Sequence, residues 1–471
     1  MVVTPFALLI IVAGTILLLR GSMLSMFSAF LISTMFGGSA AFILLVAGGS
    51  SIPPAQFMLV FVGLRMVLPG AGQIETLKRA VWENRYLAAF VTYGVMSAFL
   101  LPQVFARTMD VTPLRPIPGA DLFAVVPLRL TTQNWTTAFY MGGTLIAGIA
   151  AAAAMQRPGA AQRLVKVGAG IALAHALLGI TSVVLQGTAW DSVLALFRNG
   201  YYAQLNQSFQ GIVRMSGVWP ETSGFAAYGA IWCVFTLELW FRDVAPKRTG
   251  PAGLVLLLAL LASTSSTAYV SVGAYALFVF VRLLLGPWVM PLRKQLALIA
   301  ATLVALTTVM AGLVFVPDLS AQLSHILALM TTEKLSSGSG IQRSFWAKQG
   351  LDVFVSSYGL GIGAGSFRSS SVLTAILGSM GVIGAVTFLA HLFKSVHPFG
   401  GELLSLRSES LERAVGSAAA ATGLLMLAPM VVAAPSPDPG ILWGTMCGVA
   451  IGLRPVCERR AGYQRPRYVP A

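Results

Sequence analysis

The side chains best suited to chemistry in this sequence are arginines in polar, glycine-rich stretches between long apolar runs. Arg343 and Arg368 belong to Ser339–Ser371, which separates the apolar runs Leu296–Val316 and Val372–Phe393. A guanidinium group keeps its charge at any relevant pH and binds phosphate oxygens through two parallel hydrogen bonds. The stretch therefore predicts a site for an anionic group.

The length and aromatic content of Ser339–Ser371 also indicate function. A polar segment this long inside an otherwise hydrophobic chain is usually functional or disordered. Its aromatic side chains argue against disorder; they are Phe345, Trp346, Phe354, Tyr358 and Phe367. We expect an ordered loop, with or without a short helix, packed on a membrane-embedded scaffold.

A second polar stretch, Arg214–Ala227, places Arg214 and Glu221 at the start of an apolar segment. We expect Pro220 to start the helix, with Glu221 in its first turn, where a carboxylate complements the helix dipole. Glu221 is then a helix-terminal residue, a general base or the fixed partner of an arginine. A third stretch, Ser263–Tyr269, is a hydroxyl-rich turn that either caps a helix or binds sugar hydroxyls.

The composition sets the class of protein that must position these residues. Of the 471 residues, 56% are hydrophobic and only 10% are charged, whereas a soluble domain has about 25% charged residues. We therefore expect an all-α, polytopic membrane protein in which residues 1–471 form one integral unit.

The net charge of +15 is explained either by anchoring to anionic lipid on the cytoplasmic side or by an anionic substrate. Nucleic acid is not an expected partner, because no soluble basic domain could present a groove. The three cysteines lie in or beside apolar segments without metal-site or redox spacing, so we expect buried, inert thiols and predict no metal site and no cofactor.

Apolar segments long enough to cross a membrane, at about 20 residues per crossing, recur along the whole chain. The candidates are Pro5–Leu19, Met26–Ala47, Pro54–Leu68, Tyr86–Ala106, Thr136–Met155, Leu164–Leu185, Thr222–Trp240, Ala252–Ala262, Tyr269–Leu285, Leu296–Val316, Val372–Phe393, Val415–Val432 and Ile441–Leu453. We expect about 12–13 transmembrane helices with two or three extracytoplasmic loops.

The connections between these spans predict their orientation. Short basic connections belong in the cytoplasm; they are Glu75–Arg85, Arg157–Lys166, Arg242–Arg248, Arg293–Lys294 and Lys394–Arg413. The alternating segments Arg107–Trp135, Gln186–Trp219 and Pro317–Ser371 then lie outside. We expect 186–219, which contains Arg198, and 317–371 to be extracytoplasmic substrate-binding loops.

The ordered set RMSGVWPETSGFA, STSSTA, SGIQRSFW, GLGIGAGSFRSSS and LGSMGVIG resembles the O-antigen polymerase and ligase family of integral membrane glycosyltransferases. The resemblance covers roughly Arg214 to Leu389. It departs from the family pattern in two places: Pro-Glu-Thr-Ser replaces a Glu-Pro-Ser-like element, and Arg368–Ser371 replaces the His-Asn that often follows the glycines. The chain therefore looks more like an exopolysaccharide polymerase, and we expect no histidine base.

The resemblance implies an enzyme of the bacterial inner (cytoplasmic) membrane that polymerises polyprenyl-diphosphate-linked oligosaccharide repeats at the periplasmic face. It needs no cofactor; membrane lipid surrounds it, and a chain-length regulator and export machinery are candidate partners. The implied catalytic residues are Arg214, Glu221, Arg343 and Arg368. The implied substrate-binding residues are Arg198, Trp346, Gly361, Gly363, Gly365 and Ser369.

Two alternatives to a polymerase stay open. A ligase of the same family would transfer the finished glycan to a lipid acceptor. A transporter or flippase for an anionic glycolipid would show an inverted repeat and broken helices that meet at the membrane midplane, and the sequence shows no such repeat.

Overall fold

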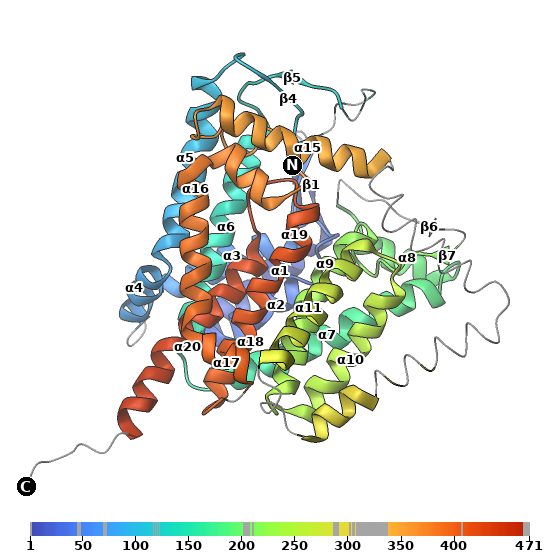
Figure 1. Ribbon diagram of the computed structural model, residues 1–471, viewed down its shortest axis with the longest axis vertical. Helices are drawn as coiled ribbons and strands as arrows, with labels where there is room; N and C mark the ends of the chain where they lie inside the picture. The colour runs from blue at the N-terminus through green and yellow to red at the C-terminus, as the bar shows by residue number, and fades with distance from the viewer. Residues whose placement is uncertain are drawn as a thin grey trace, which may run out of the picture.

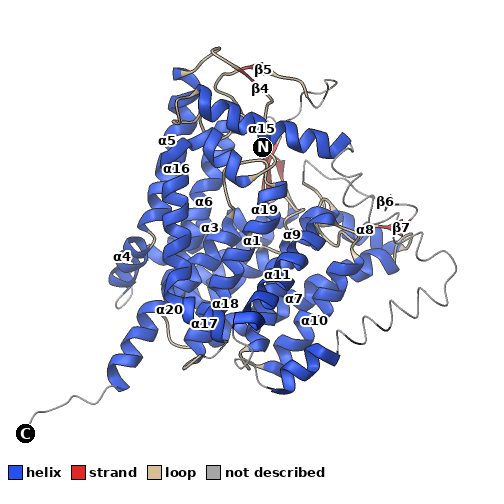
Figure 2. Ribbon diagram, in the orientation of Figure 1, coloured by secondary structure: helices blue, strands red, loops and turns tan. Residues whose placement is uncertain are grey.

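The computed structural model of the chain describes residues 2–44, 49–68, 73–115, 117, 119, 121, 123–200, 208–209, 212–285, 292–300, 303, 307, 338–406 and 408–464. Most of these residues are helical, and the strands are short (Figures 1 and 2). The expected all-α class is confirmed.

Seven helical segments of the described chain are long and apolar enough to cross a membrane. They are α5 (Arg85–Val104), α6 (Thr132–Met155), α7 (Ala160–Val184), α9 (Thr222–Phe241), α11 (Ser266–Leu285), α16 (Val372–Val396) with its continuation to Ser405, and α18 (Leu411–Leu425) with α19 (Leu427–Ala433). Four shorter apolar helices are α1 (Pro5–Arg20), α2 (Met23–Ser33), α3 (Pro54–Val67) and the first part, Ile441–Arg454, of α20 (Ile441–Gln464). The chain is a polytopic, α-helical membrane protein.

The predicted 12–13 spans are not all found within the described residues. The predicted span Leu296–Val316 lies mostly outside them. The predicted span Met26–Ala47 is wrong, because α2 ends at Ser33 and is only about 17 Å long, well short of a bilayer core of about 30 Å. Beyond α2 the chain packs closely against the segment that precedes α9: a Cβ atom at Gly37 would lie 2.3 Å from the Trp219 ring, so only glycine fits there.

The remaining elements are short helices and small antiparallel sheets. The helices are α4 (Gln73–Glu83), α8 (Ala189–Leu196), α10 (Pro246–Ala262), α15 (Gly338–Ser356), the 3-10 helix η3 (His397–Phe399) and α17 (Gly400–Ser405). The strands β1 (Val2–Val3), β2 (Phe42–Leu44) and β3 (Ser50–Ile52) form one sheet in that order, with Val3 opposite Phe42 and Ile43 opposite Ser51. The other two sheets pair β4 (Asp110–Val111) with β5 (Val126–Pro127), and β6 (Ser208–Phe209) with β7 (Ile212–Val213).

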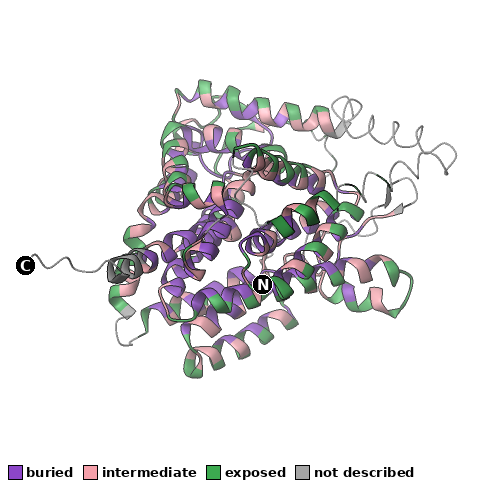
Figure 3. Ribbon diagram, turned by 60° about the horizontal axis from the view of Figure 1, so that its bottom comes forward, coloured by how far each residue is buried: buried purple, intermediate pink, exposed green. Residues whose placement is uncertain are grey.

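Small residues bring the central helices into contact. A Cβ atom at Gly444 of α20 would lie 2.5 Å from the Thr144 carbonyl oxygen of α6, so the two backbones touch. The alanine runs Ala150–Ala154 and Ala418–Ala421 are buried, as expected for helix-packing surfaces. Buried residues concentrate on these central helices (Figure 3). The three cysteines are also buried, as expected.

The predicted basic connections gather at one end of the bundle, beside α17 and α4 in Figure 1. Their contacts are a Glu83–Lys394 ion pair at 2.9 Å, a hydrogen bond of 3.1 Å from Arg242 Nη2 to the Glu402 carbonyl, and an Arg293–Asp243 ion pair at 2.6 Å. The described residues of Arg107–Trp135 and Ser339–Ser371 lie at the opposite end, where α15, β4 and β5 are, and α8, from the predicted outer segment Gln186–Trp219, lies at the side of the bundle (Figure 1). The basic connections and the predicted outer segments thus do not mix at one end of the bundle. Which end faces the cytoplasm stays a prediction.

Candidate functional site

The stretch that contains Arg214 meets the hydroxyl-rich turn that precedes α11. Arg214 Nη2 donates a hydrogen bond of 3.1 Å to the carbonyl of Thr264, a residue held at a φ of 53° in that turn. Partial burial lowers the pKa of Arg214 below its ordinary value, and the charge of Glu221 acts in the opposite direction. Two motifs that are about 50 residues apart thus form one cluster, with a cation at its centre.

α9 begins at Thr222, so the prediction that Pro220 starts the helix is wrong, and Glu221 is the residue immediately before the helix rather than part of its first turn. Its backbone is extended (φ −155°, ψ 159°), and its side chain makes no capping hydrogen bond to the helix. The carboxylate instead accepts a hydrogen bond from the Ser223 hydroxyl. Glu221 therefore lies within electrostatic range of Arg214, at the N-terminal end of α9.

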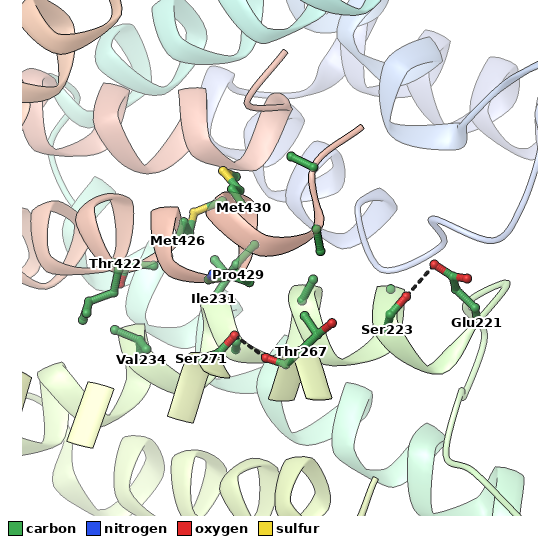
Figure 4. Close-up of a pocket in the computed structure, with 16 residues that line it drawn as sticks. Glu221, Ser223, Ile231, Val234, Thr267, Ser271, Thr422, Met426, Pro429 and Met430 are labelled. Atoms are coloured by element: carbon green, nitrogen blue, oxygen red, sulfur yellow. Dashed lines mark hydrogen bonds between the residues drawn. The ribbon is translucent and has the colours of Figure 1, made fainter. Parts of the chain in front are cut away.

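A cavity of about 220 Å³ extends from Glu221 between α9, α11 and the α18–α19 pair (Figure 4). Its apolar wall consists of Ile231, Val234, Leu425, Met426, Pro429 and Met430. The hydroxyls of Ser271 and Thr422 line it too, but each donates to a carbonyl of its own helix, at 2.7 and 2.8 Å. The wall therefore offers few free polar groups and suits an apolar occupant.

The residues of α18 and α19 in this wall were missed by the sequence reasoning. The run around Met426 and Met430 was read only as a membrane span. Met426 lies between α18 and α19, and Met430 follows four residues later in α19; methionine side chains adapt to irregular apolar partners. That spacing was the available signal.

The second pair of predicted arginines lies at α15 and at the segment that precedes α16. The Arg368 guanidinium lies over the Trp346 ring, 4.4 Å from its centroid. Arg368 Nη1 donates to the Leu114 carbonyl at 3.3 Å, and the Ser370 hydroxyl donates to the Arg343 carbonyl at 2.6 Å. The structure thus brings the backbone segments of Arg343 and Arg368 together, with Trp346 buried beneath the guanidinium.

The stretch Ser339–Ser371 contains more helix than expected. α15 runs for 19 residues, and the loop begins only at Ser357. The helix is anchored by Gln349, whose side-chain oxygen accepts the Thr112 backbone N–H at 3.0 Å. Residues 317–337 of the predicted loop lie outside the described residues.

The glycines of GLGIGAG pack against protein backbone. Gly361, Gly363 and Gly365 have φ values of 84°, 101° and 86°, and all three are buried. The N–H of Gly363 donates to the Ser379 carbonyl at 2.9 Å. This carbonyl belongs to α16, and it can accept from the loop because the backbone of α16 is non-helical at Gly381. These contacts account for the glycines, and the predicted contact with substrate stays a prediction.

Arg198 and Ser369 connect segments of the site. Nε of Arg198 donates to the Gly217 carbonyl at 2.7 Å, which fixes the stretch that carries Arg214. Burial lowers the pKa of Arg198. The Ser369 backbone N–H donates to the Pro435 carbonyl at 3.1 Å, and its hydroxyl lies 2.8 Å from that of Thr374. Both residues have clear structural partners, and their predicted contact with substrate stays untested.

The segment that follows α19 joins the two arginine clusters. Ala433 and Ala434 line the cavity that begins at Glu221, and the neighbouring Pro435 carbonyl holds Ser369. The backbone beside Arg368 is therefore connected to the end of the cavity through Ser369 and Pro435. The Arg368 side chain itself lines a separate small pocket with Trp346 and Thr112, whereas Arg214 lies beside Glu221, a lining residue of the apolar cavity.

Within the described part of the chain, no three His, Cys, Asp or Glu side chains are placed to hold a metal ion. Comparison with protein-family models, curated protein sequences and solved structures found no match. The fold and the site define an α-helical integral membrane protein with an apolar cavity that begins beside Arg214.

Proposed function

We propose that the protein is a membrane glycosyltransferase that polymerises polyprenyl-diphosphate-linked oligosaccharide repeats at the periplasmic face of the bacterial inner membrane. The observation that carries the proposal is the apolar cavity that starts at Glu221, beside Arg214, and follows α9 to Val234. Thirteen residues of α helix correspond to about 20 Å. A long isoprenoid chain with an anionic head has this combination of shape and charge.

The chemistry of the substrate explains why arginines suffice. Diphosphate is already a good leaving group, so catalysis chiefly needs positive charge where negative charge develops. Arg214 lies beside Glu221, which lines the cavity, and the backbone segments of Arg343 and Arg368 are joined to each other and, through Ser369, to Pro435. We assign these three arginines to the donor diphosphate. Glu221 then either takes the acceptor proton or holds Arg214 in place.

One structural observation favours a transporter as the second candidate function. The backbone of α16 is interrupted at Gly381 (φ 58°, ψ −152°), and interrupted helices are typical of transporter binding sites. The interruption is occupied by the glycine loop of the same chain, through the Gly363 and Ile362 N–H groups. This packing gives the break a structural reason and leaves the glycosyltransferase as the better supported function.

The test uses purified full-length protein and the lipid-linked single repeats that accumulate in cells lacking it. We expect polymer to form in detergent without added nucleotide, and an Arg214→Ala variant to form none. Transfer of the glycan only to a different lipid acceptor would identify a ligase. Absence of polymer together with ATP-independent movement of the repeat across liposomes would contradict the proposal and identify a transporter.

A further inference from the structure

The helix α15 has three distinct faces. One face packs on the bundle and is buried; its residues are Trp346, Gln349, Gly350 and Val353. A second stripe is polar, because Lys348 and Asp352 form an exposed ion pair there at 3.8 Å. The third stripe is apolar and yet faces away from the protein: Leu351 and Val355 are both exposed, Val355 by 72%. A helix whose outer surface is divided into a polar and an apolar side is typical of a boundary between water and lipid.

The depth of the turn that follows α15 is given by its contact with α5. The Tyr93 hydroxyl of α5 donates a hydrogen bond of 3.0 Å to the Leu360 carbonyl. Beyond Tyr93, toward the end of the bundle where α15 lies, α5 exposes Met96, Leu100 and Val104 (Figure 1). Val104 is 11 residues after Tyr93, which corresponds to about 16 Å of helix. Leu360 therefore lies beside the middle of a membrane-spanning helix rather than beyond its end.

The apolar stripe of α15 continues into the lipid-facing surface of α16. A Cβ atom at Gly359 would lie 3.7 Å from both the Phe354 ring and the Val382 side chain, so α15 and α16 meet at this glycine. From there the exposed residues of α16 follow the spacing of one helix face; they are Val382, Val386, Leu389 and Phe393. Leu360 is exposed as well. The exposed apolar surface is thus continuous from α15 to a membrane-spanning helix.

Tyr358 has an unusual backbone conformation at the end of α15. Its φ of 54° lies in the left-handed region, at a position after a helix that glycine usually occupies. A bulky side chain is disfavoured there, and the Tyr358 side chain is 90% exposed, so it gains no packing within the protein. Tyrosine is enriched at the boundary between membrane and water. Contact with lipid therefore explains a tyrosine at a position where the backbone favours glycine.

The turn after α15 also meets the requirement that lipid places on a polypeptide backbone. Non-helical backbone occurs at membrane depth only where the protein satisfies its polar groups. Every backbone N–H group from residue 358 to residue 363 donates to an acceptor of the protein, at 2.9–3.1 Å. The hydroxyls of Ser356 and Ser357 donate to carbonyls of α15 itself, at 2.9 and 3.1 Å. The turn therefore has the hydrogen bonding of a segment that lies in lipid.

We propose that the end of α15 and the turn after it enter the bilayer and return without crossing it, with Tyr358 as the anchor. The residues that contact acyl chains are Leu351, Val355, Tyr358 and Leu360. Lys348 and Asp352 stay on the water side, and because their charges cancel, lipid without net charge suffices. This part of the predicted extracytoplasmic loop is then re-entrant. It lies between Arg343 and Arg368 in the sequence and so keeps the arginines of the proposed diphosphate site at the edge of the bilayer.

The test measures the depth of these residues in full-length protein reconstituted in phosphatidylcholine liposomes. A nitroxide is attached to one introduced cysteine at a time; the variants are Val355→Cys, Tyr358→Cys, Lys348→Cys and Val386→Cys. The three native cysteines are buried, and wild-type protein treated with the same reagent gives the background. Collisions of each nitroxide are measured with oxygen, which partitions into acyl chains, and with a nickel chelate that stays in water.

We expect the labels at Val355 and Tyr358 to lose most collisions with the nickel chelate relative to the label at Lys348. They should match the label at Val386, on the lipid-facing side of α16. All four side chains are exposed, so their replacement costs little packing. Nickel accessibility equal to that of Lys348 would overturn the inference. A Val355 label shielded from both probes would also overturn it, because a protein partner would then cover this surface.

A second variant tests the anchor without a label at position 358. Tyr358→Gly relieves the left-handed backbone, so the protein should unfold at the same or a higher temperature in detergent. In liposomes the label at Val355 should gain collisions with the nickel chelate, and unchanged collisions would overturn the role of Tyr358. Neither measurement involves substrate. Failure here therefore leaves the proposed glycosyl transfer standing, and a protein that makes no polymer leaves this inference standing.

Discussion

Replacing Arg368 tests whether the arginines act on diphosphate or only hold the fold. Arg368 uses Nη1 for the Leu114 carbonyl at 3.3 Å and stacks on Trp346 at 4.4 Å. Stacking of a cation on an aromatic ring contributes about 0.5–2 kcal/mol, and a charged hydrogen bond about 1.5–3 kcal/mol. The planar guanidinium makes both contacts at once. A lysine at this position would lose the planar stack and the two-pronged contact with phosphate.

We therefore expect replacement of Arg368 by lysine to lower kcat nearly as much as replacement by alanine. Removing one preorganised donor from a developing negative charge costs about 10²–10³ in kcat. We expect Arg368→Ala and Arg368→Lys both to fall within this range in the polymerisation assay. Thermal unfolding should be measured alongside, because the lost contacts also lower stability.

Arg163 offers a matched control at the opposite end of the bundle. It is exposed and donates through Nε to the Ser28 hydroxyl at 3.2 Å. Arg163→Lys should keep full activity. If Arg368→Lys likewise keeps full polymer production at equal protein level, Arg368 is a structural or solvated charge, and its assignment to the leaving group is refuted.

Three further predictions address other parts of the structure. Glu221→Gln should lower the rate about as much as Arg214→Lys, and the double variant should lose little more because one residue positions the other; fully additive losses would contradict this pairing. Gly361→Ala should destabilise the fold by at least about 1–2 kcal/mol because of its positive φ, whereas Gly142→Ala, where a Cβ meets open space, should not; equal melting temperatures would contradict the packing argument. A reporter fused after Gly187 should read as periplasmic, and a cytoplasmic signal there would reverse the orientation.

The class of fold could be predicted from the sequence because membrane spans depend on simple composition. Apolar runs of about 20 residues have few alternatives to a transmembrane helix, and α6, α7 and α16 appear where their runs predict them. The error at Met26–Ala47 has a distant cause. That run contains no charged residue, but Gly37 packs against Trp219, a residue about 180 positions later.

For the site, too, the sequence showed which residues belong to one motif but not which distant segments come into contact. The sequence pointed to Arg214 and Glu221 as one cluster and to Arg343 and Arg368 as another, because each motif is polar in an apolar context. It could not show that the segment after α19 joins the clusters.

The most direct measurement of the central claim is photo-crosslinking with a polyprenyl diphosphate that carries a diazirine on its isoprenoid chain. The protein, in its native membrane, is irradiated with this probe, and the labelled peptides are identified by mass spectrometry. We predict labels on the cavity wall, at Met426 and Met430 of α18–α19 and at Ile231 of α9. The labels should weaken in Arg214→Ala, which removes the cation at the diphosphate end. Uniform labelling of lipid-facing helices, unchanged in that variant, would contradict the claim that this cavity binds the donor lipid.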